Sequence, residues 1–397
     1  ELLQVQLLLR HGARSAIHSL PGTEHNFSCT LSPEVEAAVQ LWPRAFRLTG
    51  AASGRHVRRT WRPAVASDGL TCKPGQLNDA GFHQLLALGR HFRTAYGDLE
   101  VEPEAIHARA TDYMRTRASV AAFLTGLLEL DPSTPRRREP VHIHVHERQA
   151  DEVMTGVGLQ SSSRRFNKAH PKGGAEEEAK GAQACPRATQ LSARQRAAFA
   201  PSRGLVEAME RLFGPPVRDM PVTGMADALH SAGCDGGHLP CGDGGCVDLA
   251  LARRVANDAD RQFCERYTGR AGGAESTRLA FQPLLAEILQ RMQEAAEGTT
   301  PKPRLVVFGG HDTVLSPVAS LLGFYNCKWP PFASRIVFEL WRLSTSVVAM
   351  RVLFNGRPVT GRMPGCNGRE LCPLDRFAAV VAGLLGEHAT LEAACAV

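Results

Sequence analysis

Residues 5–14 read VQLLLRHGAR and residues 304–312 read RLVVFGGHD, and these two stretches decide the fold. Each begins with an apolar run typical of a buried strand and ends in charged or polar side chains. Loops that leave the carboxyl ends of parallel strands converge on one crevice, even when the strands are far apart in the sequence. We therefore expect an α/β fold with a mostly parallel central sheet flanked by helices, and a site built from both stretches.

The polar groups of these stretches suit phosphoryl transfer. His11 stands between Arg10 and Arg14, whose planar guanidinium groups can hold phosphate oxygens in bidentate fashion. Nearby positive charge favours the neutral imidazole, so His11 can attack phosphorus. His311 can donate to a phosphate oxygen, and Asp312 can protonate the departing oxygen. Each of these residues also has an alternative interpretation. The histidine could be structural, the arginines could form surface ion pairs, and Asp312 could cap a helix.

These stretches resemble the motifs of the histidine phosphatase superfamily, specifically its acid phosphatase branch. Two more segments add to the likeness, QLNDAGFHQ at residues 76–84 and RATDYMRTRAS at residues 109–119. The resemblance implies a phosphomonoesterase that needs no metal or other cofactor and forms a phosphohistidine on His11. It also implies Asp312 as the proton donor and a phosphate site made of Arg10, Arg14, Arg109 and His311.

The length and composition allow a large core, since 43% of the 397 residues are hydrophobic and 22% are charged. The first and last thirds of the chain must fold together to assemble the site. We expect residues 1–130 and 266–397 to form the α/β phosphatase core, and residues 131–265 to be an inserted, mainly helical cap. Residues 161–180 are polar and rich in Gly and Glu, so we expect a mobile segment there.

Apolar periodicity and capping residues predict the other elements. The expected helices cover residues 78–96, 113–130, 188–213, 221–232, 247–261, 277–297 and 314–322. Expected strands lie at residues 141–146, and at 336–341 and 347–354 as a final hairpin. Residues 15–75 contain five prolines, which predict a loop-rich region.

Eleven cysteines and the glycosylation sequon at Asn26 indicate a secretory compartment. Four of the cysteines lie between residues 234 and 264, where a zinc site is the competing interpretation. The segment holds no Cys-x-x-Cys pair, and we favour disulfides there because of the secretory compartment. An odd total leaves at least one thiol free or paired with another molecule, and Cys327 is our candidate.

Two clusters have competing interpretations. The histidines at 142, 144 and 146 share one face of a predicted strand and could bind a metal, but a solvated face or a contact with the cap is favoured. The second cluster is Arg55, Arg58, Arg59 and Arg62. It is either a solvated surface or, given the formal net charge of +6, a patch that contacts an acidic glycan.

Within the family, the chain is most similar to the 2-phosphoxylose phosphatase group. Much of this likeness lies outside the site, at PCGDGGCVD (240–248), RIVFELW (335–341) and VLFNG (352–356). It implies removal of the 2-phosphate from xylose in the glycosaminoglycan–protein linkage region during proteoglycan synthesis. Another phosphatase, acting on lysophosphatidate or a phosphoprotein, and a weakly active glycan-binding relative are the alternatives.

The same likeness implies a location and partners. We expect the Golgi lumen, with a membrane anchor that this chain lacks, or alternatively secretion. No run approaches the ~20 apolar residues of a membrane span. Expected partners are the phosphorylated glycan or another phosphomonoester, and a glycosyltransferase of the linkage pathway, with no nucleic acid.

Overall fold

The computed structural model describes residues 1–21, 27–50, 72–99, 102–130, 139–146, 151–156, 185–298, 303–344 and 347–396. Three predictions fall outside these residues: the glycosylation site at Asn26, the cluster Arg55, Arg58, Arg59 and Arg62, and the polar segment 161–180. They stay predictions. No helix in the described ranges has the length and apolarity needed to cross a bilayer.

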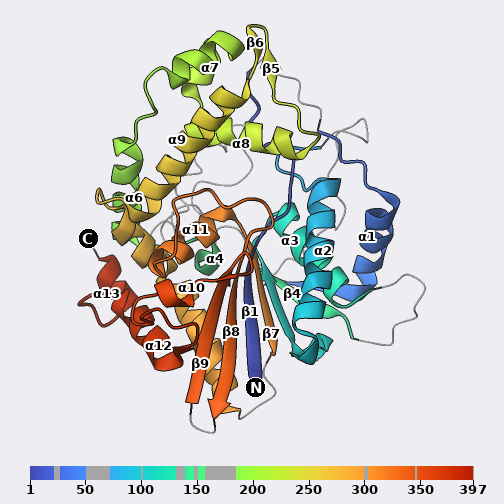
Figure 1. Ribbon diagram of the computed structural model, residues 1–397, viewed down its shortest axis with the longest axis vertical. Coiled ribbons are helices and arrows are strands. Elements are labelled where there is room, and N and C mark those ends of the chain that lie inside the picture. Colours follow the sequence, from blue (N-terminus) through green and yellow to red (C-terminus); the bar gives the residue numbers. More distant parts are fainter. Residues whose placement is uncertain are drawn as a thin grey trace.

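A nine-stranded sheet forms the centre of the protein (Figure 1). Its strands are β1 (Leu2–Arg10), β2 (Phe46–Thr49), β3 (Ile106–Ala110), β4 (Val141–Val145), β7 (Leu305–Gly310), β8 (Arg335–Ser344), β9 (Val347–Phe354), β10 (Arg357–Pro358) and β11 (Cys372–Pro373). The order is β10-β9-β8-β1-β7-β3-β4-β2, with β11 also paired to β9. Strands β1, β7, β3, β4 and β2 run parallel, and β8 to β11 form an antiparallel extension. The predicted α/β fold is confirmed.

Helices cover both faces of the sheet. One face packs against α1 (Pro33–Ala45), α2 (Asp79–Ala95) and α3 (Met114–Leu127), and the other against α10 (Gly273–Glu297), α11 (Asp312–Leu321) and α12 (Leu374–Gly383). Successive side chains of a strand point to opposite faces. Leu7 and Leu9 therefore enter the first core while Leu8 enters the second. Burial on both faces explains why β1 and β7 are apolar runs in the sequence.

A group of helices gathers beyond the carboxyl ends of β1 and β7 (Figure 1). It consists of α6 (Pro186–Ala198), α7 (Leu205–Phe213), α8 (Val222–Cys234) and α9 (Leu249–Thr268). A separate core, which includes Met225 and Val255, joins α7, α8 and α9 to Ala16 and Leu20 of the loop after β1. These helices form a cap that packs on the loop carrying the first motif.

The predicted start of the cap at residue 131 is too early. Strand β4 pairs in parallel with both β3 and β2, so Val141–Val145 belong to the central sheet. The alternating apolar residues of this segment face the core of α1, α2 and α3. In the structure, this strand is part of the α/β core and not of the cap.

Helix predictions succeed where capping signals are local. The side chain of Asn78 accepts a hydrogen bond from the Gly81 amide at 3.0 Å and so caps α2 as expected.

The sequence did not predict α1, which has Pro33 in its first turn, where a missing N–H costs nothing, and Pro43 near its end. The predicted helix at 188–213 is two helices, α6 and α7, with Pro201 and Gly204 between them.

The cysteines form five disulfides. The pairs are Cys29–Cys72, Cys185–Cys395, Cys241–Cys246, Cys264–Cys327 and Cys366–Cys372. The prediction that Cys327 is the spare thiol is wrong, since the loop after α11 brings it to α9 and to Cys264. The free thiol is Cys234, at the end of α8.

Candidate active site

The two sequence motifs meet at the centre of the sheet. Strands β1 and β7 are neighbours, and Arg10 pairs with Gly310 in register, so His11 and His311 leave the sheet side by side. Their ring centroids are 5.4 Å apart. The His11 amide donates to the Gly310 carbonyl at 3.1 Å. The structure thereby brings together His11, Arg10, Arg14, His311 and Asp312.

Close packing against α2 and α3 fixes the loop of the first motif. The Gly12 amide donates to Ser119 Oγ at 3.1 Å, and the Ala13 amide donates to Gln84 Oε1 at 2.9 Å. A β-carbon at Gly12 would collide with the Gly81 backbone and with Leu85. Only glycine permits this approach, and that is the structural reason for the residue after His11.

The environment of His11 keeps its imidazole neutral. Burial and then the positive charges of Arg115, Arg14 and Arg10 hold the pKa of His11 well below its usual value. The Nδ1 atom lies 2.9 Å from the Gly12 carbonyl oxygen, which can only accept a hydrogen bond. A neutral ring that donates from Nδ1 leaves the lone pair of Nε2 free to attack an electrophile.

Arg10 and Arg14 are each oriented by a carboxylate. Nη2 of Arg10 lies 2.6 Å from Asp312 Oδ2, and Nη2 of Arg14 lies 2.6 Å from Asp227 Oδ1. Asp227 belongs to the cap helix α8, 213 positions from Arg14, and no local sequence signal marks it. Burial alone would raise the pKa of Asp227, but Arg14, His18 and the Ile17 amide together lower it far below its usual range.

The structure places Arg109 differently from the prediction. Its guanidinium group donates to Asp151 Oδ1 at 2.5 Å and to Glu287 Oε2 at 3.2 Å. Glu287 lies on α10, so Arg109 points to the sheet face that this helix covers. Strand alternation explains the direction, because Ala108 and Ala110 face the opposite core. Two carboxylates already neutralise this arginine.

A different arginine stands beside His11. Arg115, in the first turn of α3, is the largest of the charges that lower the pKa of His11. Its guanidinium carbon lies 4.2 Å from the centre of the Tyr113 ring, and it forms no ion pair within the described residues. Burial and the neighbouring charge of Arg14 lower the pKa of Arg115 to about 9. Among the described residues, this partly buried cation has no anionic partner, and it is therefore available to a phosphate.

His311 and Asp312 form the other side of the site. His311 Nε2 lies 2.9 Å from Thr111 Oγ1, and Asp312 is the first residue of α11. The indole Nε1–H of Trp329 donates to Asp312 Oδ2 at 2.8 Å, on the oxygen that Arg10 also contacts. Asp312 Oδ1 has no hydrogen-bond donor among the described residues, so it is the oxygen available to a substrate.

The loop that carries Trp329 is anchored to the cap. Cys327 is bonded to Cys264 of α9, and the Trp329 amide donates to Asp260 Oδ1 at 2.7 Å. The indole stacks on Phe263 with ring centroids 4.6 Å apart. These contacts hold the indole N–H in place against Asp312.

Phe332, from the same loop, is the aromatic wall of the site. Its ring centre lies 4.4 Å from the guanidinium carbon of Arg10 and 5.5 Å from that of Arg14. The ring also lies 5.7 Å from that of His11. Sequence reasoning identified neither Phe332 nor Trp329, because both lie on a loop without regular periodicity. Arg115 was within the segment quoted for the family likeness, and its place at a helix start was the signal.

Comparison with known proteins shows the family of the chain. The model of the histidine phosphatase superfamily (branch 2) matches residues 1–201 and 255–355. 2-Phosphoxylose phosphatase 1 of Danio rerio is 25% identical over 428 residues, which cover 96% of this chain and 78% of that protein. Its namesake in Xenopus tropicalis is 32% identical over 181 residues, 44% of this chain and 36% of that protein. Human testicular acid phosphatase is 25% identical, over 95% of this chain and 78% of that protein.

Solved structures share the fold. The apo form of Hafnia alvei phytase superposes with a TM-score of 0.54 at 16% identity, over 100% of this chain and 98% of that chain. Its complex with myo-inositol hexakis sulphate gives a TM-score of 0.53 at 17% identity with the same coverage. At such identities the likeness concerns the fold alone.

Proposed function

Because the chain belongs to the histidine phosphatase superfamily (branch 2) and is a phosphomonoesterase, we propose that it works through a phosphohistidine on His11. His11 Nε2 attacks phosphorus, and the bond between phosphorus and the ester oxygen breaks. Asp312 gives its proton to that oxygen, and the alcohol departs. Water then attacks the phosphohistidine while Asp312 takes up a proton, which releases phosphate and restores His11.

One observation carries this proposal: a neutral, buried imidazole surrounded by Arg10, Arg14 and Arg115 and facing His311. The three guanidinium groups and His311 supply donors for the non-reacting phosphate oxygens, whose charge grows in the transition state. Arg115 takes the role that the sequence assigned to Arg109, because Arg109 is held by Asp151 and Glu287.

For the substrate we infer a sugar phosphate, 2-phosphoxylose in the glycosaminoglycan–protein linkage region. Support comes from relatives named 2-phosphoxylose phosphatase 1 that align over 95% or more of this chain. Five disulfides fit a protein of the secretory pathway, and within that pathway we propose the Golgi lumen. The arginines at 55, 58, 59 and 62 would then meet an acidic glycan, and a glycosyltransferase of the same pathway is the proposed partner.

Two measurements test the proposal. Rapid acid-free quenching with labelled substrate should trap phosphate on His11 of the wild-type protein, and His11→Ala should neither turn over nor carry label while keeping its circular dichroism spectrum. Label on another residue contradicts the mechanism.

Kinetics with matched esters test the substrate. A xyloside 2-phosphate should give a higher kcat/KM than the 3-phosphate, a phosphopeptide or lysophosphatidate. A higher kcat/KM for the phosphopeptide or for lysophosphatidate would contradict the sugar substrate. It would not contradict the phosphohistidine mechanism.

A further inference from the structure

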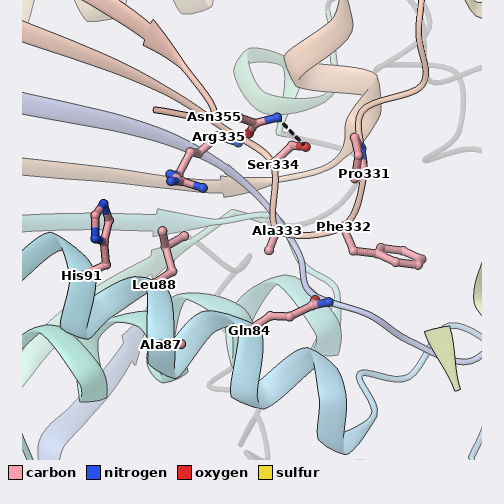
Figure 2. A pocket seen from close by; sticks show the side chains of 10 residues that line it. All are labelled: Gln84, Ala87, Leu88, His91, Pro331, Phe332, Ala333, Ser334, Arg335 and Asn355. Atoms are coloured by element: carbon pink, nitrogen blue, oxygen red, sulfur yellow. Dashed lines mark hydrogen bonds between the residues drawn. The ribbon is translucent and has the colours of Figure 1, made fainter. Parts of the chain in front are cut away.

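A pocket of about 470 Å³ lies beside the catalytic loop (Figure 2). One wall is α2, and the other is the segment that leads into β8, with Asn355 beyond it. Its lining comprises Gln84, Ala87, Leu88, His91, Pro331, Phe332, Ala333, Ser334, Arg335 and Asn355. Two of these residues are basic and none is acidic, so the pocket is set up for a neutral or anionic ligand.

The pocket adjoins the active site through shared residues. Phe332 lines the pocket and also contacts Arg10 and the His11 ring. Gln84 lines the pocket and accepts a hydrogen bond from Ala13, while the Ala333 amide donates to the His11 carbonyl at 3.0 Å. A substrate whose phosphate lies at His11 would therefore need to extend only past the Phe332 ring to enter the pocket.

The polar groups of the pocket are mostly donors. Figure 2 shows the guanidinium group of Arg335 and the ring of His91 entering the same end of the pocket from opposite walls. Arg335 is partly buried and forms no ion pair with any described residue, and burial lowers its pKa. Gln84 Oε1 is occupied by the Ala13 amide, which leaves its Nε2 hydrogens to donate. Leu88 adds apolar surface beside Arg335 and His91, and Phe332 lies at the other end of the pocket (Figure 2).

Hydrogen bonds of Asn355 make the pocket rigid. Its Oδ1 accepts from the Arg335 amide at 2.8 Å, and its Nδ2 donates to Ser334 Oγ at 3.3 Å. Backbone pairing of Arg10 with Ser334 at 2.8 Å holds the same segment against β1. Arg335 is thus presented from a fixed backbone, so only its side chain has to be ordered when it binds a ligand.

We propose that this pocket binds a second, non-reacting anionic group on the leaving-group side of the substrate, such as the carboxylate or sulfate of an adjoining sugar. Arg335 pairs with the anion in bidentate fashion, His91 donates to it, and the sugar ring lies against Leu88 (Figure 2). Gln84 and Phe332 line the end of the pocket nearer to the active site. The assignment rests on the proposed phosphatase function and specifies its substrate class: an acidic glycan, rather than an isolated sugar phosphate.

The test compares substrates that differ only in this second charge. Xyloside 2-phosphates are extended with a hexuronate, a sulfated hexose or the corresponding neutral hexose, and kcat/KM is measured for wild type and Arg335→Gln. Loss of a charge-assisted hydrogen bond should lower kcat/KM for one or both acidic substrates by about tenfold or more. The neutral analogue and 4-nitrophenyl phosphate should change less than twofold. Arg357→Gln, which alters an exposed arginine outside the pocket, is the matched control.

Equal losses on acidic and neutral substrates, or no loss at all, would overturn the proposal. A hexuronate effect without a sulfate effect assigns the pocket to carboxylates, and the reverse assigns it to sulfates. Binding is measured apart from turnover by saturation-transfer NMR of methyl glucuronide and a methyl glycoside sulfate with His11→Ala. This variant should bind at least one of the two, and His11→Ala combined with Arg335→Gln should bind neither. If the protein is not a phosphatase, it will not turn over these substrates, but the difference in binding between His11→Ala and the double variant will remain.

Discussion

Trp329→Phe isolates one hydrogen bond of Asp312, the proposed catalytic acid. The change removes the indole N–H that donates to Asp312 Oδ2 at 2.8 Å, and it keeps an aromatic ring to stack on Phe263. A hydrogen bond to a charged group contributes about 1.5–3 kcal/mol. Without it, Asp312 is held by Arg10 alone, and Oδ1 is less well directed at the leaving oxygen. If most of that energy is lost from the transition state, kcat falls by about 10- to 150-fold.

The loss should depend on the leaving group. An alkyl or sugar alcohol needs the proton of Asp312 as it departs, whereas 4-nitrophenolate does not, so only the former should lose rate. The assay is kcat and KM for a series of phosphate esters that spans both kinds. Trp341→Phe is the control, since that indole also donates to a carboxylate, Glu339 Oε2 at 2.9 Å, but pairs with Leu2 at the far end of β1. Equal losses for alkyl and aryl esters, or equal losses in the two variants, would refute the positioning role.

Three more predictions follow from the same geometry. Asp312→Asn should lower turnover of sugar phosphates by roughly 10²–10⁴-fold and that of aryl phosphates much less; equal losses would make Asp312 structural. Arg115→Ala removes a positive neighbour of His11, so the pKa of His11 rises and the acid limb of the kcat/KM profile moves to higher pH. Arg109→Ala should leave that limb in place and lower the melting temperature, because it removes the ion pairs of Arg109 with the buried Asp151 and with Glu287. Burial, Arg291 and His144 lower the pKa of His107 to about 3. Below pH ~6.5, His107 therefore binds a proton in the unfolded chain but stays neutral in the folded protein. The stability of the fold falls as the pH drops from that value toward 3. Between pH 7 and pH 5, the free energy of unfolding of His107→Gln should fall by up to about 2 kcal/mol less than that of wild type, as measured by denaturant titration. Equal decreases in the two proteins would contradict the assignment.

The fold and the centre of the site could be predicted because their signals are local. An apolar strand followed at once by Arg-His-Gly or His-Asp needs only the rule that strand ends converge. The position of Asn78 before an apolar helix is equally local, and it caps α2 as expected. These features depend on neighbouring residues, so one sequence is enough to predict them.

The rest depended on contacts between distant segments. Asp227 reaches Arg14 because the cap folds over the loop after β1, and no spacing in the sequence records that approach. The Cys264–Cys327 bond likewise depends on how the loop after α11 meets α9. The direction of Arg109 is a different case. Its neighbours Ala108 and Ala110 point to the α3 side, so strand alternation already directs Arg109 to the other face.

The two arginines of the first motif are held by carboxylates from different parts of the chain. Arg10 Nη2 lies 2.6 Å from Asp312 Oδ2, at the start of α11. Asp227 keeps Arg14 in place, because it also accepts from the Ile17 amide and belongs to the cap. The two arginines of one motif therefore have different partners: Arg14 is tied to the cap through Asp227, and Arg10 is tied to Asp312, the residue proposed as the proton donor.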